Sequence, residues 1–206
     1  MKKDWKIKNS NSVDSNSLGK SLNINPAIAQ LLINRGITNI HQANSFLMAD
    51  LSQLHDPFLL KGMETAIKRI AQAQSLGERV LIFGDYDVDG VTSSYLLAAI
   101  LKKMGITVIN KIPHRVDDGY GLNHDVAAFA YDQGIKLVIT VDCGISSVSE
   151  IAAINDKGID LIIVDHHEPD HILPNAVAII NPKQTDCPYP FKHLASVGIV
   201  AKIIQA

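Results

Sequence analysis

Apolar runs with strand character recur through the second part of the chain, and helical patterns separate the first four of them. The predicted strands cover residues 79–84, 107–112, 136–141, 159–164 and 176–180. Strands that alternate with helices pair in parallel, because each crossover helix returns the chain to the same end of the sheet. Their nearly continuous Val, Leu and Ile content indicates burial on both faces. The pattern therefore predicts an α/β fold, with a mostly parallel sheet that helices cover on both faces.

Helical patterns also fill the segment before the first strand. The predicted helices begin near residues 26, 41, 62, 92, 125, 147 and 193. The first has Pro26 in its opening turn and Gly36 beyond its end, the usual placement of these two residue types. The first part of the chain is rich in Asn, Ser and Lys and shows no periodicity. The sequence thus predicts a flexible polar arm at 1–23, a small helical lead-in at 24–77 and the α/β domain at 78–206.

Composition limits the classes to which the chain can belong. Its 206 residues, 47% hydrophobic and 19% charged, are typical of one medium or two small globular domains. A formal net charge of -2 gives no overall basic signature, so a nucleic-acid partner would be held by local basic groups or through metal ions. Cys143 and Cys187 lie far apart and form no CxxC pair, so the sequence indicates neither a zinc site nor a disulfide framework. Without a signal-like start or a run of 18 apolar residues, we expect a cytoplasmic protein with no membrane partner.

Three carboxylates follow the first predicted strand at alternate positions, Asp85, Asp87 and Asp89, just before Gly90. Side chains two apart in extended backbone share a face, so these groups can converge on one point. Clustered like charges are costly unless a cation or hydrogen-bond donors compensate them. The simpler interpretation is an acidic loop, because Asp is a common turn residue.

Polar groups also follow two other strands, which favours the metal site over the acidic loop. Asp142 follows the strand at 136–141, and Asp165, His166 and His167 follow the strand at 159–164. Ligands of open α/β sheets bind just outside the carboxyl ends of the strands. Three polar clusters at one edge therefore predict a metal site there.

The donor types indicate which metals and which reaction suit this site. Carboxylates with one or two imidazoles suit Mn²⁺ or Mg²⁺, and the nitrogen ligands favour Mn²⁺. A tetrahedral zinc site would need cysteines or more histidines. The acidic groups exceed the need of one ion, so two ions bridged by a shared carboxylate are expected. Such pairs activate a water and stabilise the attacking and leaving oxygens, which predicts hydrolysis of a phosphoester or phosphoanhydride.

A second run, residues 112–122, follows a neighbouring strand. Arg115 suits bidentate contact with a phosphate, and its alternative is a salt bridge to one of the two aspartates that follow it. Gly119 and Gly121 permit a close approach of the backbone, and Tyr120 stacks on a base or packs against the protein.

The motifs, taken in order, resemble a known family. The first three motifs of the DHH phosphoesterase superfamily are similar to Asp85–Gly90, Val141–Gly144 and Asp165–His167. Three further segments resemble the RecJ-type branch of this superfamily, whose members are single-stranded-DNA-specific exonucleases. They are His114-Arg115 with Gly119–Leu122, Ile180–Pro182, and Leu54–Leu60. The resemblance covers about residue 25 to the end. The Asp-His-His triplet alone is a weak signal, whereas the ordered set is specific.

The resemblance implies a 5′→3′ exonuclease that acts on single-stranded DNA in recombination and repair, with two Mn²⁺ or Mg²⁺ ions. By matching position, Asp85 would bind one ion, Asp87 and His166 would bind the other, and Asp142 would bridge the two. Asp89 and Asp165 would not bind an ion themselves but would orient the residues that do.

The resemblance also implies groups that meet the substrate. His167 and Arg115 would face the scissile or neighbouring phosphate and act in catalysis with Asp142. The predicted substrate-binding residues are His114, Arg115, Gly119, Tyr120, Gly121 and His167.

The carboxyl end departs from the family pattern. RecJ-like enzymes continue with a fourth motif, whose aspartate completes the metal site, and no such aspartate follows Asp186. We therefore expect a truncated or partial form, with a second chain as a candidate source of the missing part. Two alternatives stay open: a catalytically inactive binding module or fragment with the same fold, and a small-substrate phosphoesterase or pyrophosphatase. The retained motifs argue against the first, and the RecJ-like segments argue against the second.

Overall fold

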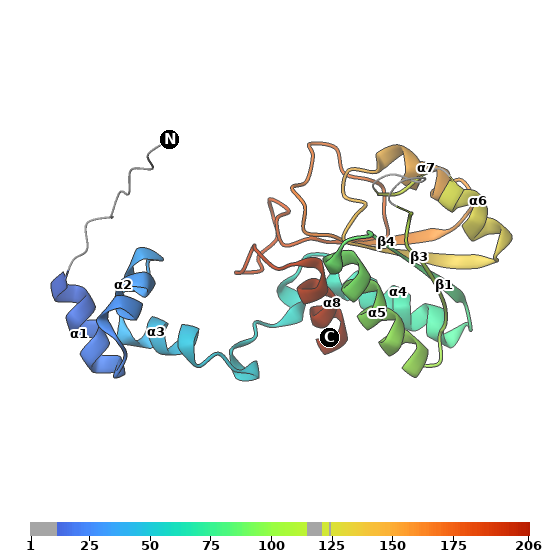
Figure 1. The fold of residues 1–206 in the computed structure, drawn as a ribbon. Helices are drawn as coiled ribbons and strands as arrows, with labels where there is room; N and C mark the ends of the chain where they lie inside the picture. The colour runs from blue at the N-terminus through green and yellow to red at the C-terminus, as the bar shows by residue number, and fades with distance from the viewer. Residues whose placement is uncertain (1–11, 115–120, 124) are drawn as a thin grey trace. The chain divides into compact units, whose positions relative to one another are not determined.

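The computed structural model describes residues 12–114, 121–123 and 125–206, which form two compact units, Met1–Leu54 and His55–Ala206 (Figure 1). The smaller unit contains helices α1 (Ser12–Leu22), α2 (Pro26–Asn34) and α3 (Ile40–Leu47), and a short 3-10 turn η1 (Leu51–Gln53). Its buried core consists of Leu18, Ala29, Leu32 and Ala43. Helix α2 begins as predicted, because the Asn25 side chain accepts a hydrogen bond from the Ala27 N–H and Pro26 occupies the first turn.

Helix α1 contradicts the expectation of a flexible arm over residues 1–23. Within that segment, Ser12–Leu22 is helical and Leu18 is only 7% exposed. Its few apolar residues give no readable periodicity, and packing against α2 supplies the stabilisation that the local sequence lacks. Burial of Leu18 against Ala29 and Leu32 therefore makes a helix from a segment that is polar in composition.

The larger unit contains the sheet and the remaining elements. Before the sheet come the 3-10 turn η2 (Pro57–Leu59) and helix α4 (Met63–Ser75). The strands are β1 (Arg79–Gly84), β2 (Thr107–Lys111), β3 (Ile135–Val141), β4 (Asp160–Val164) and β5 (Ala178–Ile180). The other helices are α5 (Val88–Lys103), α6 (Asp125–Asp132), α7 (Val148–Asn155) and α8 (Ser196–Gln205). Within the described ranges, none of the helices combines the length and the apolar composition that a membrane crossing requires.

The five strands form one sheet in the order β2-β1-β3-β4-β5, and every neighbouring pair is parallel. Alternate residues of β1 enter two cores: Val80 and Ile82 face α4, α5 and α8, whereas Leu81 and Phe83 face α6 and α7 (Figure 1). The predicted α/β fold, with a parallel sheet covered on both faces, is confirmed.

Helix α4 lies with the sheet and not with the lead-in helices. The sequence placed a boundary at residues 77 and 78, whereas the two units divide between Leu54 and His55. Met63, Ala66 and Ile70 of α4 are buried in the same core as the β1 side chains. Its apolar face therefore belongs to the larger unit.

Candidate metal centre

The topology of the sheet brings the predicted ligands to one edge. From β1 the chain passes to β2 on one side, and then returns to β3, β4 and β5 on the other side. Ligands of open parallel sheets bind at such a point of reversal, outside the carboxyl ends of the strands. Asp85 follows β1 and Asp142 follows β3, so the two acidic groups flank this point.

The acidic loop after β1 turns tightly into helix α5. Asp87 caps this helix, because its side chain accepts a hydrogen bond of 3.0 Å from the Gly90 N–H. A Cβ atom at residue 90 would lie 2.4 Å from the backbone oxygen of Asp85, a distance at which no side chain fits. Glycine at this position lets the first turn of α5 pack directly on the strand end.

Asp142 has an unusual backbone conformation. Its φ angle is 63°, in the left-handed region that residues other than glycine rarely adopt. The residue is 1% exposed, directly after the buried end of β3. Strained backbone of this kind occurs at functional sites, where the surrounding structure holds the residue in place.

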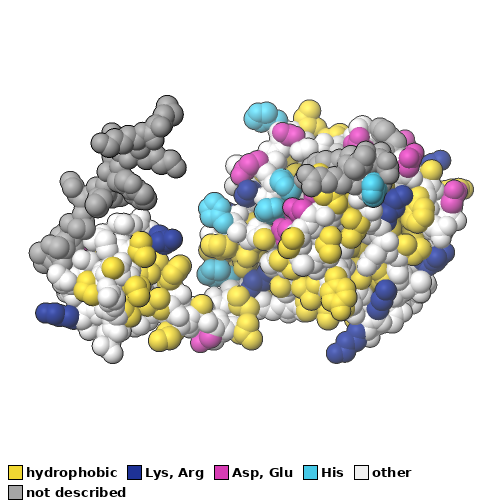
Figure 2. Space-filling view, in the orientation of Figure 1, with side chains coloured by type: hydrophobic (Ala, Val, Ile, Leu, Met, Phe, Trp, Pro, Cys, Tyr) yellow, Lys and Arg dark blue, Asp and Glu magenta, His cyan; other side chains and the backbone are white. Residues whose placement is uncertain are grey.

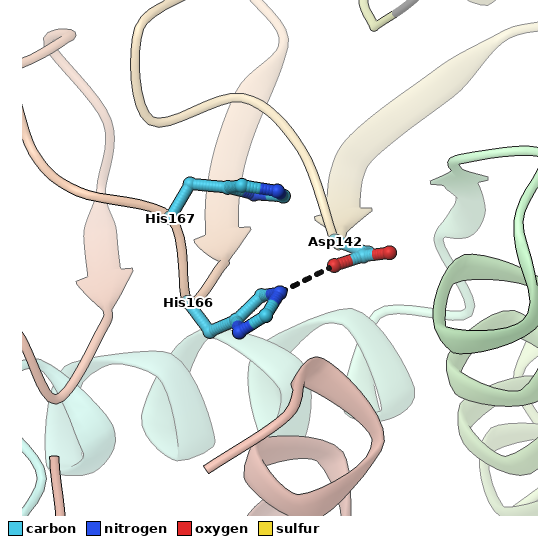
Figure 3. Close-up of side chains that lie close together, drawn as sticks. All are labelled: Asp142, His166 and His167. Atoms are coloured by element: carbon cyan, nitrogen blue, oxygen red, sulfur yellow. Dashed lines mark ion pairs between the residues drawn. The ribbon is translucent and has the colours of Figure 1, made fainter. Parts of the chain in front are cut away.

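The two histidines after β4 point toward Asp142 (Figure 3). The Nε2 atom of His166 lies 3.2 Å from Oδ1 of Asp142. His167 stands beside it, and the two ring centroids are 4.7 Å apart. One potential ligand atom from each of Asp142, His166 and His167 lies within 4.8 Å of the others.

Asp142 belongs to two ligand groups. Asp85, Asp87 and Asp142 form the second set, again with potential ligand atoms within 4.8 Å of one another. A carboxylate common to two such groups is suited to bridge two ions. The grouping differs from the assignment implied by the resemblance in two respects. Asp87 lies with Asp85 and not with His166, and His167, which the resemblance assigns to the phosphate, lies with Asp142 and His166.

Asp165 holds the loops of the centre in position. Its carboxylate accepts hydrogen bonds from the backbone N–H groups of Ile145, His166 and His167, at 3.0, 2.7 and 3.1 Å. It also lies 2.7 Å from Nδ1 of His167. Burial of the Asp165 carboxylate acts to raise its pKa, but the hydrogen bonds from His167 and Ile145 outweigh it and the pKa is lowered. The same contact raises the pKa of His167.

Asn181 is a supporting residue that the sequence reasoning did not single out. It is fully buried after β5, and its Nδ2 donates a hydrogen bond of 2.9 Å to the backbone oxygen of His167. In the sequence, the only indication of a role for Asn181 is that it lies in the Ile180–Pro182 segment, which resembles the family.

The electrostatics of the centre favour a cation. Burial, followed by the charge of Asp89, raises the pKa of Asp142 to about 7. Burial also raises the pKa of Asp85, whereas the hydrogen bond from Gly90 lowers that of Asp87. Figure 2 shows acidic side chains beside histidines on one face of the larger unit.

Two buried oxygen atoms test whether a metal fits here. Among the described residues, Oδ1 of Asp85 has no hydrogen-bond partner, and Oδ1 of Asp142 has none besides its 3.2 Å contact with Nε2 of His166. Buried carboxylate oxygens without donors are costly, and a coordinated cation removes the cost. The donor set of three carboxylates with one or two imidazoles fits Mn²⁺ or Mg²⁺.

Asp89 connects the centre to helix α8. Its Oδ2 and Oδ1 accept hydrogen bonds from the backbone N–H groups of Ser196 and Val197, at 2.7 and 2.8 Å. Its Oδ2 also lies 3.7 Å from Nε2 of His166. The sequence reasoning did not foresee this contact, because the partners are 107 residues apart in the chain.

The predicted substrate-binding residues are described only in part. Gly121, with a φ of 80°, lines a cavity of about 440 Å³ together with Ser147 and His167. His114 is exposed just after β2. Arg115, Gly119 and Tyr120 lie outside the described residues.

Comparison with known proteins confirms the predicted resemblance. A model of the DHH family, N-terminal domain, matches residues 79–206. The chain is 42% identical over 202 residues to the single-stranded-DNA-specific exonuclease RecJ of Bacillus subtilis (strain 168), which covers 98% of this chain and 26% of that relative. A crystal structure of exonuclease RecJ bound to manganese matches 70% of this chain and 37% of its own, with a TM-score of 0.65 at 30% identity. RecJ of Thermus thermophilus in complex with Mn²⁺, at 24% identity and a TM-score of 0.73 over 93% of this chain and 26% of its own, supports the fold. The chain thus spans about a quarter of the length of the Bacillus subtilis relative.

Proposed function

Because the chain belongs to the DHH family, we propose that it hydrolyses phosphodiester bonds of single-stranded DNA from the 5′ end, with Mn²⁺ or Mg²⁺ as its cofactor. The observation that carries the proposal is the convergence of two ligand groups on Asp142 at the reversal point of the sheet. The names of the similar proteins support single-stranded DNA as the substrate. A role in recombination and repair, in the cytoplasm, follows from the same resemblance.

Each side chain of the centre has a proposed task. Asp142 would bridge two ions, with Asp85 on one ion and His166 on the other. Asp87 would add a third carboxylate to the group of Asp85 and Asp142. When bound, the ions would supply an activated water and neutralise charge on the attacking and leaving oxygens. Asp165 contacts the ring of His167 through Nδ1, so Nε2 would be the atom that faces a phosphate. Because the contact with Asp165 raises the pKa of His167, the ring is suited to hold a proton at Nε2 and to donate it in a hydrogen bond to a phosphate oxygen.

The remaining predicted groups would guide the DNA strand. Gly121 presents its backbone at the cavity beside His167, where a nucleotide can approach closely. His114, Gly119 and Tyr120 are proposed contacts of the same strand, and Arg115 is the proposed phosphate clamp. A second chain that supplies a fourth-motif aspartate stays a prediction.

One observation favours a second candidate, a phosphoesterase for small substrates. The cavity beside His167, at about 440 Å³, falls in the size range of small-molecule sites. A dinucleotide could be held there without an extended strand path. Activity on dinucleotides but not on long strands would support this candidate.

The decisive experiment measures cleavage of a long, 5′-labelled single strand by the purified chain in Mn²⁺. We expect mononucleotide release by the parent and none by Asp142→Ala, because no other carboxylate belongs to both ligand groups. Asp186→Ala is the matched control: Asp186 is exposed and pairs only with Lys61 in the described contacts, so its loss should leave cleavage unchanged. Equal Mn²⁺-dependent cleavage by parent and Asp142→Ala would refute the assignment, and a folded parent inert on both long strands and dinucleotides would favour the binding module.

A further inference from the structure

We propose that Ser196, the first residue of helix α8, is a positioning residue of the metal centre and acts through Asp89. The inference rests on the proposed function, because it concerns how the same centre holds its ions. No motif of the sequence includes Ser196, and the contact joins the start of α5 to the start of α8.

The contact engages both oxygens of Asp89. The Ser196 N–H donates to Oδ2 at 2.7 Å, and the Val197 N–H donates to Oδ1 at 2.8 Å. Backbone N–H groups at the start of a helix have no partner within the helix and carry its positive dipole end, so they suit a carboxylate. Hydrogen bonds to a charged acceptor are the stronger kind. The two bonds therefore fix the plane of the carboxylate.

Helix α8 provides a rigid support for this contact. Ser196 itself is fully buried. The helix also buries Ile199, Val200 and Ile203 in the core under the sheet. Near its other end, the buried Lys202 donates a hydrogen bond of 2.6 Å from Nζ to the backbone oxygen of His55. Because α8 is held along its length, its first N–H groups cannot follow a movement of Asp89.

The distance between Asp89 and His166 explains what the contact achieves. Oδ2 of Asp89 lies 3.7 Å from Nε2 of His166, beyond hydrogen-bond range. Nε2 is also the atom that His166 directs at Asp142, and so the atom available to an ion. Without the two backbone bonds, the Asp89 carboxylate would swing onto Nε2 and compete with the ion. Helix α8 thus keeps Asp89 close enough to attract a cation and too far to block its ligand.

One substitution removes the backbone N–H donor of residue 196 together with the serine hydroxyl. Proline lacks an N–H and is well tolerated at the first position of a helix, the position of Ser196. The preceding residue, Ala195, has φ -68° and ψ 161°, which is the conformation that a following proline requires. Ser196→Pro therefore deletes the donor to Asp89 in a helix that can still form. Ser196→Ala separates the two contributions of this residue, since it loses the hydroxyl, which interacts with the Asp142 carboxyl, and keeps the N–H that holds Asp89.

The test is Mn²⁺ affinity by titration calorimetry on the full chain, with circular dichroism to confirm helix content. We expect Ser196→Pro to bind Mn²⁺ roughly 10- to 100-fold more weakly, the usual loss when a group that orients a metal ligand is removed. Ser196→Ala keeps the N–H that holds Asp89, so its loss of affinity should be clearly smaller than that of Ser196→Pro. Parent-like affinity of Ser196→Pro would overturn the inference, and so would an equal loss in Ser196→Ala, because the hydroxyl would then be responsible.

A second measurement applies if Ser196→Pro does not fold. Amide exchange by NMR at Ser196 and Val197 should be slow in the parent and faster in Asp89→Asn, which should also bind Mn²⁺ more weakly. Unchanged exchange at both amides in Asp89→Asn would contradict the inference. A parent that takes up no Mn²⁺ would overturn the proposed function together with it, whereas a parent and a Ser196→Pro variant with equal affinity would overturn the inference alone.

Discussion

Asp142 combines two features that destabilise the folded chain, a strained backbone and a buried carboxyl group. Its left-handed backbone is a strained conformation, of the kind that costs about 1–3 kcal/mol. Its carboxyl is buried near Asp89, and among the described residues its Oδ1 has no partner besides the His166 ring at 3.2 Å. The fold therefore maintains an arrangement that is unfavourable by itself and favourable around a cation. A residue of this kind is expected to trade stability for function.

A pH-dependent stability follows from the pKa of Asp142, which is raised from 3.8 to about 7. The folded chain thus binds this proton more tightly than the unfolded chain does. The stabilisation is complete below about pH 4 and is lost as the pH rises toward 7. In EDTA at pH 8, we expect Asp142→Asn to be more stable than the parent by on the order of 1 kcal/mol or more, since each pKa unit corresponds to about 1.4 kcal/mol.

The measurement is urea unfolding of both proteins between pH 4 and pH 8. The difference should shrink toward pH 4, and asparagine tolerates the left-handed backbone. A variant less stable than the parent at pH 8 would contradict the prediction. Addition of Mn²⁺ should stabilise the parent and not Asp142→Asn.

Gly90 permits the close contact between α5 and the end of β1. A Cβ atom at this position would lie 2.4 to 2.7 Å from three backbone atoms of Asp85, which no rotamer change can relieve. We expect Gly90→Ala to cost at least about 2 kcal/mol of unfolding free energy and to weaken Mn²⁺ binding, because it displaces the Asp85 loop. Gly105→Ala is the control. Alanine would be strained at the φ of 86° found there, but no atom lies within 4 Å of the added Cβ, so only the backbone strain would destabilise this variant. Equal unfolding midpoints for the two variants in urea would refute this account.

At the scale of elements, the sequence predicted what depends on local pattern. The five strands and the helices between them follow from apolar runs and periodicity. The convergence of the candidate ligands between Asp85 and His167 follows from their places at strand ends. Contacts between segments that are distant in the chain could not be predicted from the local sequence pattern. Ser196 meets Asp89 across 107 residues, and Asn181 supports His167 through a backbone oxygen. Neither residue type is unusual in its local sequence, so only the fold identifies them.

Helix α1 is a whole element that the local sequence pattern did not predict. Its helical state depends on Leu18, which packs with Ala29 and Leu32 in a core of few residues. We expect Leu18→Ala to cost about 2–5 kcal/mol within the smaller unit, the range for large-to-small core substitutions, and to unfold α1. Leu31→Ala, at a position 54% exposed on α2, should have little effect. NMR chemical shifts of residues 12–22 provide the measurement, and helical shifts retained in Leu18→Ala would contradict the prediction.

At the scale of the molecule, the chain contains separate cores with different tasks. The smaller unit buries its own cluster, and every candidate metal ligand that the structure describes lies in the larger unit, between Asp85 and His167. Small units bury a lower fraction of their surface and are correspondingly less stable. Metal binding should therefore stabilise one part of the chain and not the other.

Thermal unfolding followed residue by residue can test this separation. A ligand that binds only the folded state stabilises it by about 2.7 kcal/mol at a concentration 100 times its Kd. We expect Mn²⁺ to raise the melting temperature reported by NMR signals of β3 and β4, and to leave that reported by α1 and α2 unchanged. Mg²⁺ should act in the same direction, and EDTA should reverse the effect because the ligands remain in place. An equal rise in both units would show that the metal also stabilises the smaller core, which the position of its ligands does not predict.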